Sequence, residues 1–324
     1  MYDEKTGIFR LRFDDAVQIS ATLIDNLPKL RSILYKNAFV AELQAGQCYA
    51  VDNHRFLHGR TSFTGSRELL RVLAYPHPAP SRKCILFDVD GTLCNCPELS
   101  IDAFYRCISD VSGKDIRHDN TNVNLHGQTD LSLVRDILEY HKIEGEAITP
   151  VVRSFFDLHP VYMSQSIDKG FQASRCVKIL ETLEWLATQR ENSDHEVCIG
   201  LLTGNSRANT ILKLTAAGIP INAFDFNISS FGNTCSSRLS LFQHSVKKIE
   251  SKYCEPVEAA DIMLVGDTPL DVKCAKAVGC RVVAVATGNY AMEDLKAHDP
   301  DIVCESLEEA TDYMRYFLSG RLRQ

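Results

Sequence analysis

The stretch Ile85-Leu86-Phe87-Asp88-Val89-Asp90-Gly91-Thr92-Leu93 decides how this 324-residue chain folds. Residues 84–87 are apolar without polar alternation, which predicts a fully buried strand. Asp88 then stands at the carboxyl end of a parallel strand, where open α/β sheets place their ligand crevice. Gly91 allows the chain to leave the strand sharply. We therefore expect an α/β fold with a Rossmann-like, doubly wound parallel sheet and an acidic loop at its edge.

Two further apolar runs end in small polar clusters. Ile262-Met263-Leu264-Val265 precedes Gly266-Asp267-Thr268-Pro269-Leu270-Asp271, and residues 197–202 precede Thr203-Gly204-Asn205. A single Asp-x-Asp-Gly stretch is an ordinary surface turn, but three buried strands with polar ends indicate a site. Two carboxylates as close as Asp88 and Asp90 repel unless a cation or a shared proton relieves them. The pattern predicts a nucleophile, a proton shuttle and a Mg²⁺ ion close together.

These motifs resemble those of the haloacid-dehalogenase-like (HAD-like) phosphohydrolases, from about Lys83 to the end of the chain. The resemblance implies that Asp88 attacks phosphorus and forms an aspartyl-phosphate. It implies that Asp90 protonates the leaving group and later activates water. We expect a phosphatase acting on a small phosphorylated metabolite. The acid at position 90 argues against dehalogenase chemistry, whereas phosphomutase and phosphonatase activities stay open.

The same resemblance implies a metal site and phosphate-binding groups. Mg²⁺ would be held by Asp88, by the backbone carbonyl of Asp90 and by Asp267, with Asp271 near the metal or orienting its partners. The phosphoryl group would be bound by a basic residue of the third motif and by residues of the second. These candidates are Arg238, with Lys247 as the alternative, and Thr203, Gly204 and Asn205.

More than a hundred residues separate the first motif from Thr203, too many for a simple crossover. Residues 100–140 and 148–189 show helical apolar spacing, and they resemble the inserted helical cap of phosphoglycolate-phosphatase-like proteins. We expect a core of residues 83–94 and 190–324 and a cap of about 95–189. The turn His126-Gly127-Gln128-Thr129-Asp130 resembles a cap turn that faces the active site, which makes Thr129 a candidate substrate contact. His126 is either a contact or a solvated turn residue.

Residues 1–76 precede a Pro-rich linker at 77–82 and have a different character. The stretch Leu57-His58-Gly59-Arg60 resembles the end of γ-butyrobetaine-hydroxylase/taurine-dioxygenase-like (TauD/TfdA) oxygenases, whose fold is a double-stranded β-helix or jelly roll. The resemblance implies a truncated C-terminal fragment of such a domain. In it, His58 would be the distal iron ligand, and Arg67 or Arg71 would pair with 2-oxoglutarate.

The oxygenase motif is incomplete in this segment. A facial triad also needs a His-x-Asp/Glu pair, and residues 1–82 contain none. We therefore expect no oxygenase activity from the chain as given, and Fe²⁺ and 2-oxoglutarate would be cofactors only with a complete upstream domain. The alternative is an Fe(II)/2-oxoglutarate dioxygenase fused to the HAD-like domain. An isolated piece of β-helix exposes strand edges, which predicts packing against the second domain, self-association or local disorder.

Composition limits the partners. The hydrophobic content is 45%, the formal net charge is −7 and the pI is about 5.8, which argues against nucleic acid as a partner. We expect no membrane span or signal peptide. Several of the 12 cysteines fall in apolar contexts, which is typical of buried thiols in a reducing compartment. The cytoplasm is the expected location, or an organelle if the true N-terminus is missing.

Overall fold

The computed structural model describes residues 2–3, 8–9, 82–125, 127–192 and 196–319. The chain divides into two units, residues 1–74 and 75–324. In the first unit, β1 (Tyr2–Asp3) pairs antiparallel with β2 (Ile8–Phe9). The oxygenase-like candidates His58, Arg67 and Arg71 lie outside the described residues, as do His126 and residues 77–81 of the expected linker. Their roles stay predictions.

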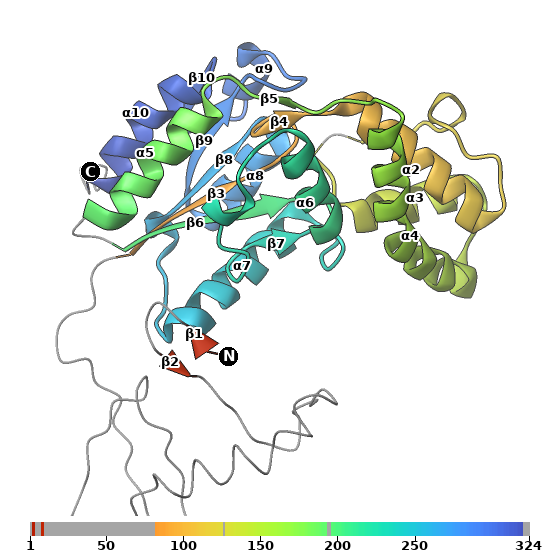
Figure 1. Cartoon of the computed structure of the whole chain (residues 1–324), viewed down its shortest axis with the longest axis horizontal. Helices are drawn as coiled ribbons and strands as arrows, with labels where there is room; N and C mark the ends of the chain where they lie inside the picture. Colours follow the sequence, from red (N-terminus) through yellow and green to blue (C-terminus); the bar gives the residue numbers. More distant parts are fainter. Residues whose placement is uncertain (1, 4–7, 10–81, 126, 193–195, 320–324) are drawn as a thin grey trace, which may run out of the picture. The chain divides into compact units, whose positions relative to one another are not determined.

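A six-stranded sheet of parallel strands forms the centre of the second unit, in the order β10-β9-β8-β3-β6-β7 (Figure 1). Strand β3 lies between β6 and β8, with Phe87 opposite both Leu201 and Val265. The first motif therefore leaves the middle of the sheet, and the expected Rossmann-like α/β fold is confirmed. The strands are β3 (Arg82–Phe87), β6 (Glu196–Thr203), β7 (Ser230–Phe231), β8 (Ile262–Gly266), β9 (Arg281–Val285) and β10 (Ile302–Cys304).

Helices cover both faces of the sheet, which explains why β3 is apolar throughout. Ile85 and Phe87 belong to one hydrophobic cluster, and Cys84 and Leu86 belong to the other, because successive side chains of a strand point to opposite faces. The first face packs on α5 (Ile179–Asn192), α6 (Arg207–Ala216) and α10 (Leu307–Leu318), and the second on α7 (Arg238–Tyr253), α8 (Pro269–Val278) and α9 (Met292–Lys296).

A helical insertion separates β3 from β6, and we call it the cap. It leaves the core through β4 (Cys94–Asn95) and returns through β5 (Ser174–Arg175), which pair antiparallel. The cap has a hydrophobic cluster of its own, with Ile108 and Phe155 fully buried. Its helices are α2 (Pro97–Ser112), α3 (Asp130–Tyr140) and α4 (Ile148–Asp168), and it contains short 3₁₀ turns at His118–Asn120 and Gly145–Ala147. Two further 3₁₀ turns, Ile221–Ala223 and Ala259–Asp261, belong to the core.

The cap ends earlier along the chain than the sequence predicts. Helix α5 begins within the expected cap of 95–189, but it packs against β6 and α10 of the core. Leu183 and Leu186 of α5 are buried in the cluster on that face of the sheet. Helical periodicity shows that a helix has an apolar side, but it does not show which surface covers that side.

Among the described residues, none of the helices has the length and apolar character that crossing a bilayer requires.

Candidate active site

Three carboxylates meet where β3 and β8 end. Asp88 directly follows β3, and its backbone N–H donates to the carbonyl of Val265 at 2.9 Å. Asp267 directly follows β8, and Asp271 lies in the first turn of α8. Each offers a carboxylate oxygen within 4.8 Å of the others, and all three residues are buried. We call Asp88, Asp267 and Asp271 the acidic cluster.

Arg238 is the basic residue beside the acidic cluster. Its Nη2 donates to Oδ2 of Asp88 at 2.6 Å, and its Nη1 lies 3.4 Å from Oδ1 of Asp271. The guanidinium also donates to the carbonyls of Leu202 at 2.9 Å and of Gly127, in the cap, at 3.0 Å. Burial lowers the pKa of Arg238, but attraction to Asp271 and Asp88 outweighs burial and raises it above its usual value. These four partners hold the guanidinium in place between core and cap.

The alternative basic candidate lies elsewhere. Lys247 is exposed on α7, and none of the contacts recorded for the described residues joins it to a carboxylate of the acidic cluster. Of the two candidates, the structure brings only Arg238 to these carboxylates.

The acidic cluster has the donor set of a divalent-cation site. Burial, reinforced by repulsion from Asp88 and Asp271, raises the pKa of Asp267 well above its usual range. Burial also raises the pKa of Asp271 to about 6. One guanidinium against three carboxylates leaves excess negative charge, and carboxylate oxygens are the ligands that Mg²⁺ prefers. The residues present therefore fit Mg²⁺.

Gly91 lets the first motif approach the acidic cluster. Its φ is +75°, and a Cβ built there would lie 2.1 Å from Oδ2 of Asp267. Any other residue would push the Asp267 carboxylate aside and would also adopt a strained backbone conformation. The loop and the carboxylate can share this space only because residue 91 has no side chain.

Asp90 has different surroundings from Asp88. Its side chain is 44% exposed, whereas that of Asp88 is 5% exposed. Lys213 Nζ donates to its Oδ1 at 2.9 Å and to its Oδ2 at 2.7 Å, and Asn205 Nδ2 donates to Oδ2 at 2.7 Å. Desolvation raises the pKa of Asp90, but attraction to Lys213 and the hydrogen bonds from Lys213 and Asn205 outweigh it, so the pKa is below its usual value.

Asn205 and Lys213 also bind each other. Asn205 Oδ1 accepts from Lys213 Nζ at 2.7 Å, and Asn205 Nδ2 donates to Thr203 Oγ1 at 2.9 Å. Asn205 follows β6 closely, and Lys213 lies on α6 with only 3% of its side chain exposed. We call Asn205 and Lys213 the α6 clamp. Thr203 is connected to Asp90 through it.

Sequence reasoning missed Lys213. The residue stands between Leu212 and Leu214 in a helix, where a lysine usually belongs to a solvated face. One signal was present. Asn209 and Lys213 are spaced i, i+4, so they share one side of α6, and both are buried.

The cap turn docks on the core through its backbone. The N–H of Asp130 donates to the carbonyl of Gly204 at 2.7 Å, and the N–H of Leu131 donates to that of Gly232 at 3.0 Å. Oδ2 of Asp130 accepts from the N–H of Ser206 at 2.7 Å, at the start of α6. A Cβ at residue 204 would lie 2.0 Å from the carbonyl oxygen of Gln128, so Gly204 provides the room for this contact.

Thr129, the predicted substrate contact in this turn, has a structural partner. Its Oγ1 accepts from the N–H of Ser132 at 3.2 Å and caps α3. The hydroxyl is fully buried with the residue. The capping bond accounts for its position.

A second cap–core contact joins α4 to α6. His159 Nδ1 lies 2.7 Å from Asn209 Nδ2, and both residues are buried. His159 Nε2 has no hydrogen-bond partner among the described residues. Burial, assisted by the charge of Lys213, lowers the pKa of His159 to about 3. The ring is therefore neutral at physiological pH.

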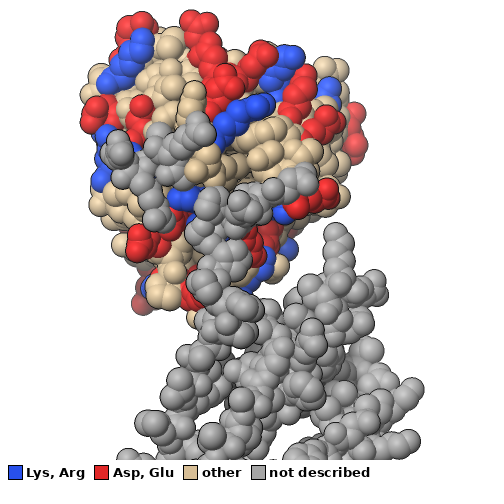
Figure 2. Space-filling view, turned by 90° about the vertical axis from the view of Figure 1, so that its left-hand side faces the viewer, with Lys and Arg blue, Asp and Glu red and all other residues tan. Residues whose placement is uncertain are grey.

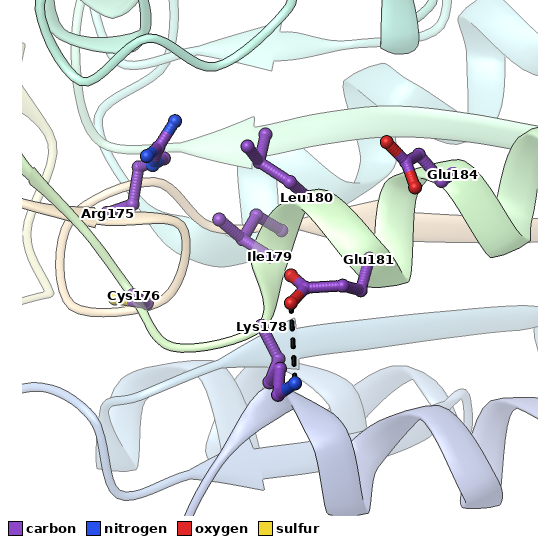
Figure 3. Close-up of a pocket in the computed structure, with 7 residues that line it drawn as sticks. All are labelled: Arg175, Cys176, Lys178, Ile179, Leu180, Glu181 and Glu184. Atoms are coloured by element: carbon purple, nitrogen blue, oxygen red, sulfur yellow. Dashed lines mark ion pairs between the residues drawn. The ribbon is translucent and has the colours of Figure 1, made fainter.

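A surface hollow of about 470 Å³ lies near β5 and the start of α5 (Figure 3). Lys178 and Glu181 form an ion pair of 3.4 Å at its edge. Its lining contains neither the acidic cluster nor the α6 clamp; it consists of Arg175, Cys176, Lys178, Ile179, Leu180, Glu181 and Glu184. On the described part of the face in Figure 2, acidic and basic side chains are mixed, and the basic ones do not gather into a patch.

Comparisons with known proteins agree with both resemblances. Residues 240–310 match the family model described as HAD-hydrolase-like, and residues 5–73 match that of the taurine catabolism dioxygenase TauD, TfdA family. A sequence search of curated proteins found no significant match. The resemblance of the chain to these two families, expected from its motifs, is therefore confirmed.

Solved structures resemble the second unit in fold. A β-phosphoglucomutase from Clostridium difficile is 17% identical, with a TM-score of 0.53 over 75% of this chain and 100% of that chain. A protein described as a predicted phosphoglycolate phosphatase from Haemophilus somnus is 19% identical, with a TM-score of 0.51 over 72% and 98%. A hydrolase from Pseudomonas syringae is 17% identical, with a TM-score of 0.50 over 72% and 98%. At these identities the likeness shows a shared fold alone.

Proposed function

We propose that the second unit is a Mg²⁺-dependent phosphatase that hydrolyses a small phosphorylated metabolite through an aspartyl-phosphate on Asp88. The observation that carries the proposal is the different environment of two carboxylates in one motif. Asp88 is buried beside Arg238 in the acidic cluster, while Asp90 is half-exposed and held by the α6 clamp. A nucleophile needs a fixed, desolvated position, and a proton shuttle needs access to the leaving group and to water.

The reaction would run in two steps. In the first, an oxygen of Asp88 attacks phosphorus as the bond to the leaving oxygen breaks, and Asp90 gives that oxygen a proton. In the second, water attacks phosphorus as its bond to the Asp88 oxygen breaks, and Asp90 takes the proton of the water. Inorganic phosphate leaves, Asp88 is again a carboxylate and Asp90 is again protonated.

Other residues of this chain would bind the phosphoryl group and neutralise charge. Thr203 is at the end of β6, next to β3, and its hydroxyl is close to the α6 clamp. Arg238 balances the charge of Asp88 and donates in the direction of the acidic cluster. Charge-assisted donors of this kind stabilise phosphoryl oxygens.

Asp88, the backbone carbonyl of Asp90 and Asp267 would hold Mg²⁺, with Asp271 orienting its neighbours. When bound, the ion would screen Asp88 from the negative phosphate and neutralise charge on the phosphoryl oxygens. Asp271 already accepts from Thr268 Oγ1 at 2.6 Å, which suits an orienting role.

The position of the cap favours a small substrate. It contacts the core beside the acidic cluster, since Gly127 accepts from Arg238 and Asp130 binds Ser206. A docked cap excludes water from the reacting groups. Two of the similar structures carry names that refer to phosphorylated compounds, phosphoglucomutase and phosphoglycolate phosphatase, which agrees with the proposal.

Hydrolysis of p-nitrophenyl phosphate with Mg²⁺ tests the proposal. We expect turnover by the wild type, loss of at least ~10³-fold in Asp88→Asn because the amide is no nucleophile, and loss with EDTA. Asp136→Asn on the exposed surface of α3 is the matched control and should keep full turnover. Wild-type turnover that survives in Asp88→Asn would contradict the mechanism.

The family match at residues 5–73 favours a second candidate function, that of an Fe(II)/2-oxoglutarate oxygenase. His58 and Arg67 or Arg71 would then serve the iron and 2-oxoglutarate. The test is succinate formation from 2-oxoglutarate with Fe²⁺ in the presence of small trimethylammonium compounds. Formation that is lost in His58→Ala would show that these residues serve an oxygenase site, whereas none from the chain as given is the result that the missing His-x-Asp/Glu pair predicts.

A further inference from the structure

Asp90 is held more firmly than a half-exposed carboxylate requires. Lys213 donates to both of its oxygens, at 2.9 Å and 2.7 Å, and Asn205 donates to one of them at 2.7 Å. Lys213 and Asn205 are themselves joined at 2.7 Å. Three mutually bonded groups fix the plane of the carboxylate as well as its position.

We propose that Lys213 is a positioning residue that, with Asn205, orients Asp90 for the second half-reaction, hydrolysis of the phosphorylated Asp88. The proposal rests on the proposed function, because it assigns a partner to the proton shuttle of that reaction. The pairing with an ammonium group suits this half-reaction, in which Asp90 enters as a carboxylate and accepts a proton from water. The geometry must be right before a base can act.

The surroundings of Lys213 indicate a dedicated position. Its Nζ is the charged end of a side chain that is only 3% exposed, and burying an ammonium is costly unless it is paired and hydrogen-bonded. The pairing is to Asp90 rather than to a carboxylate of the acidic cluster.

The helix that carries Lys213 is also the one that the cap holds. Ser206, its N-cap residue, donates to Asp130 of the cap at 2.7 Å. Asn209, one turn before Lys213, contacts His159 of α4 at 2.7 Å. The α6 clamp is therefore complete in the arrangement in which the cap is docked.

The test separates the two half-reactions. In p-nitrophenyl phosphate the leaving group departs without a proton, so kcat/KM reports the first step and is insensitive to the position of Asp90. In Lys213→Met we expect kcat to fall about 10- to 100-fold, within the effect of losing acid–base catalysis. KM should fall in parallel, kcat/KM should stay within about 3-fold, and stopped-flow traces should show a burst of p-nitrophenolate.

A merely structural role for Lys213 would give a different result. It would lower kcat/KM as much as kcat and give no burst, and that outcome overturns the proposal. Lys213→Gln, which is one atom shorter than lysine, removes the charge and keeps a polar end; it serves if Lys213→Met does not fold. Lys252→Met is the matched control, because it removes a lysine of α7 that is paired with Asp225. It should leave kcat and kcat/KM unchanged.

A double variant distinguishes this proposal from the proposed function. If Lys213 acts through Asp90, Lys213→Met should add less than about 2-fold to the loss in kcat of Asp90→Asn. Full additivity would contradict the proposal while leaving the phosphatase function intact. Absence of any Asp88-dependent turnover in the wild type would instead contradict the phosphatase function itself.

Discussion

The acidic cluster and the α6 clamp show two ways of holding a carboxylate of the same motif. In the acidic cluster, one Arg238 serves Asp88 and Asp271, and all of these groups are buried. At the α6 clamp, Lys213 forms an ion pair with Asp90, and Asp90 stays 44% exposed. An excess of buried negative charge favours the binding of a cation. A carboxylate that is paired with one ammonium group and reached by solvent is instead suited to exchanging protons. The following predictions test this difference.

The largest effect should come from removing Arg238. In Arg238→Met the three carboxylates of the acidic cluster would lose their nearest positive charge, and two backbone carbonyls would lose a donor. We expect a loss of about 3–5 kcal/mol in the free energy of unfolding without Mg²⁺, measured by urea denaturation. Lys247→Met on the exposed side of the same helix should stay within about 0.5 kcal/mol of the wild type. Equal losses in the two variants would contradict this assignment.

Mg²⁺ should stabilise the protein through one region and not the other. At a Mg²⁺ concentration 100 times its dissociation constant, binding to the native state adds about 2.7 kcal/mol, which raises Tm in a thermal melt. Asp267→Asn should lose this increase. Asp90→Asn should keep it, because only the backbone carbonyl of residue 90 would bind the metal. A loss of the increase in both variants would mean that the two regions share one ion site.

The pH dependence of stability should reveal the contact between the cap and α6. Because the pKa of His159 is lowered to about 3, the folded protein keeps it neutral while the unfolded chain binds a proton below pH 6.5. The contribution of His159 to the free energy of unfolding is therefore present above about pH 6.5 and is lost as the pH falls below that value. Between pH 7 and pH 5 the wild type should lose about 2 kcal/mol more than His159→Phe, measured by urea denaturation at both values.

The comparison between variants matters because Asp130 acts in the opposite direction. Burial raises the pKa of Asp130 to about 6, so its contribution to the free energy of unfolding grows as the pH falls through that value. Both the wild type and His159→Phe contain Asp130, and its effect cancels in the difference. Identical pH profiles of the two proteins would show that His159 is not held neutral.

A smaller effect on stability should come from removing Lys213. In Lys213→Met water can solvate the half-exposed Asp90, so we expect a loss of only about 1 kcal/mol. Urea denaturation beside Arg238→Met measures the contrast. A loss as large as that of Arg238→Met would remove the distinction between the buried and the open carboxylate.

The sequence predicted the fold and the placement of several candidate residues for one physical reason. Strands buried on both faces are continuous apolar runs, and parallel strands bring their carboxyl ends to one edge. The positions of Asp88, Asp267 and Thr203 follow from that rule alone. Their catalytic roles stay proposals.

The remaining features depend on packing between distant segments. The spacing of Asn209 and Lys213 places both on one side of α6, but it does not indicate that this side meets Asp90, and a lysine inside a helix usually faces water. The same holds for Thr129 and Asp130: both belong to the quoted turn, but only the docked backbone shows that Thr129 caps α3 while Asp130 reaches Ser206. The end of the cap at β5 depends likewise on which surface covers α5.

The pairing of β4 with β5 has a consequence for engineering. Cys94 lies opposite Arg175 and Asn95 opposite Ser174, so the two chain crossings between core and cap run side by side, about 5 Å apart. A segment whose ends meet in this way is a replaceable cassette. A short turn could close the gap to give the core without its cap, and a cap from another protein could be joined at the same two points.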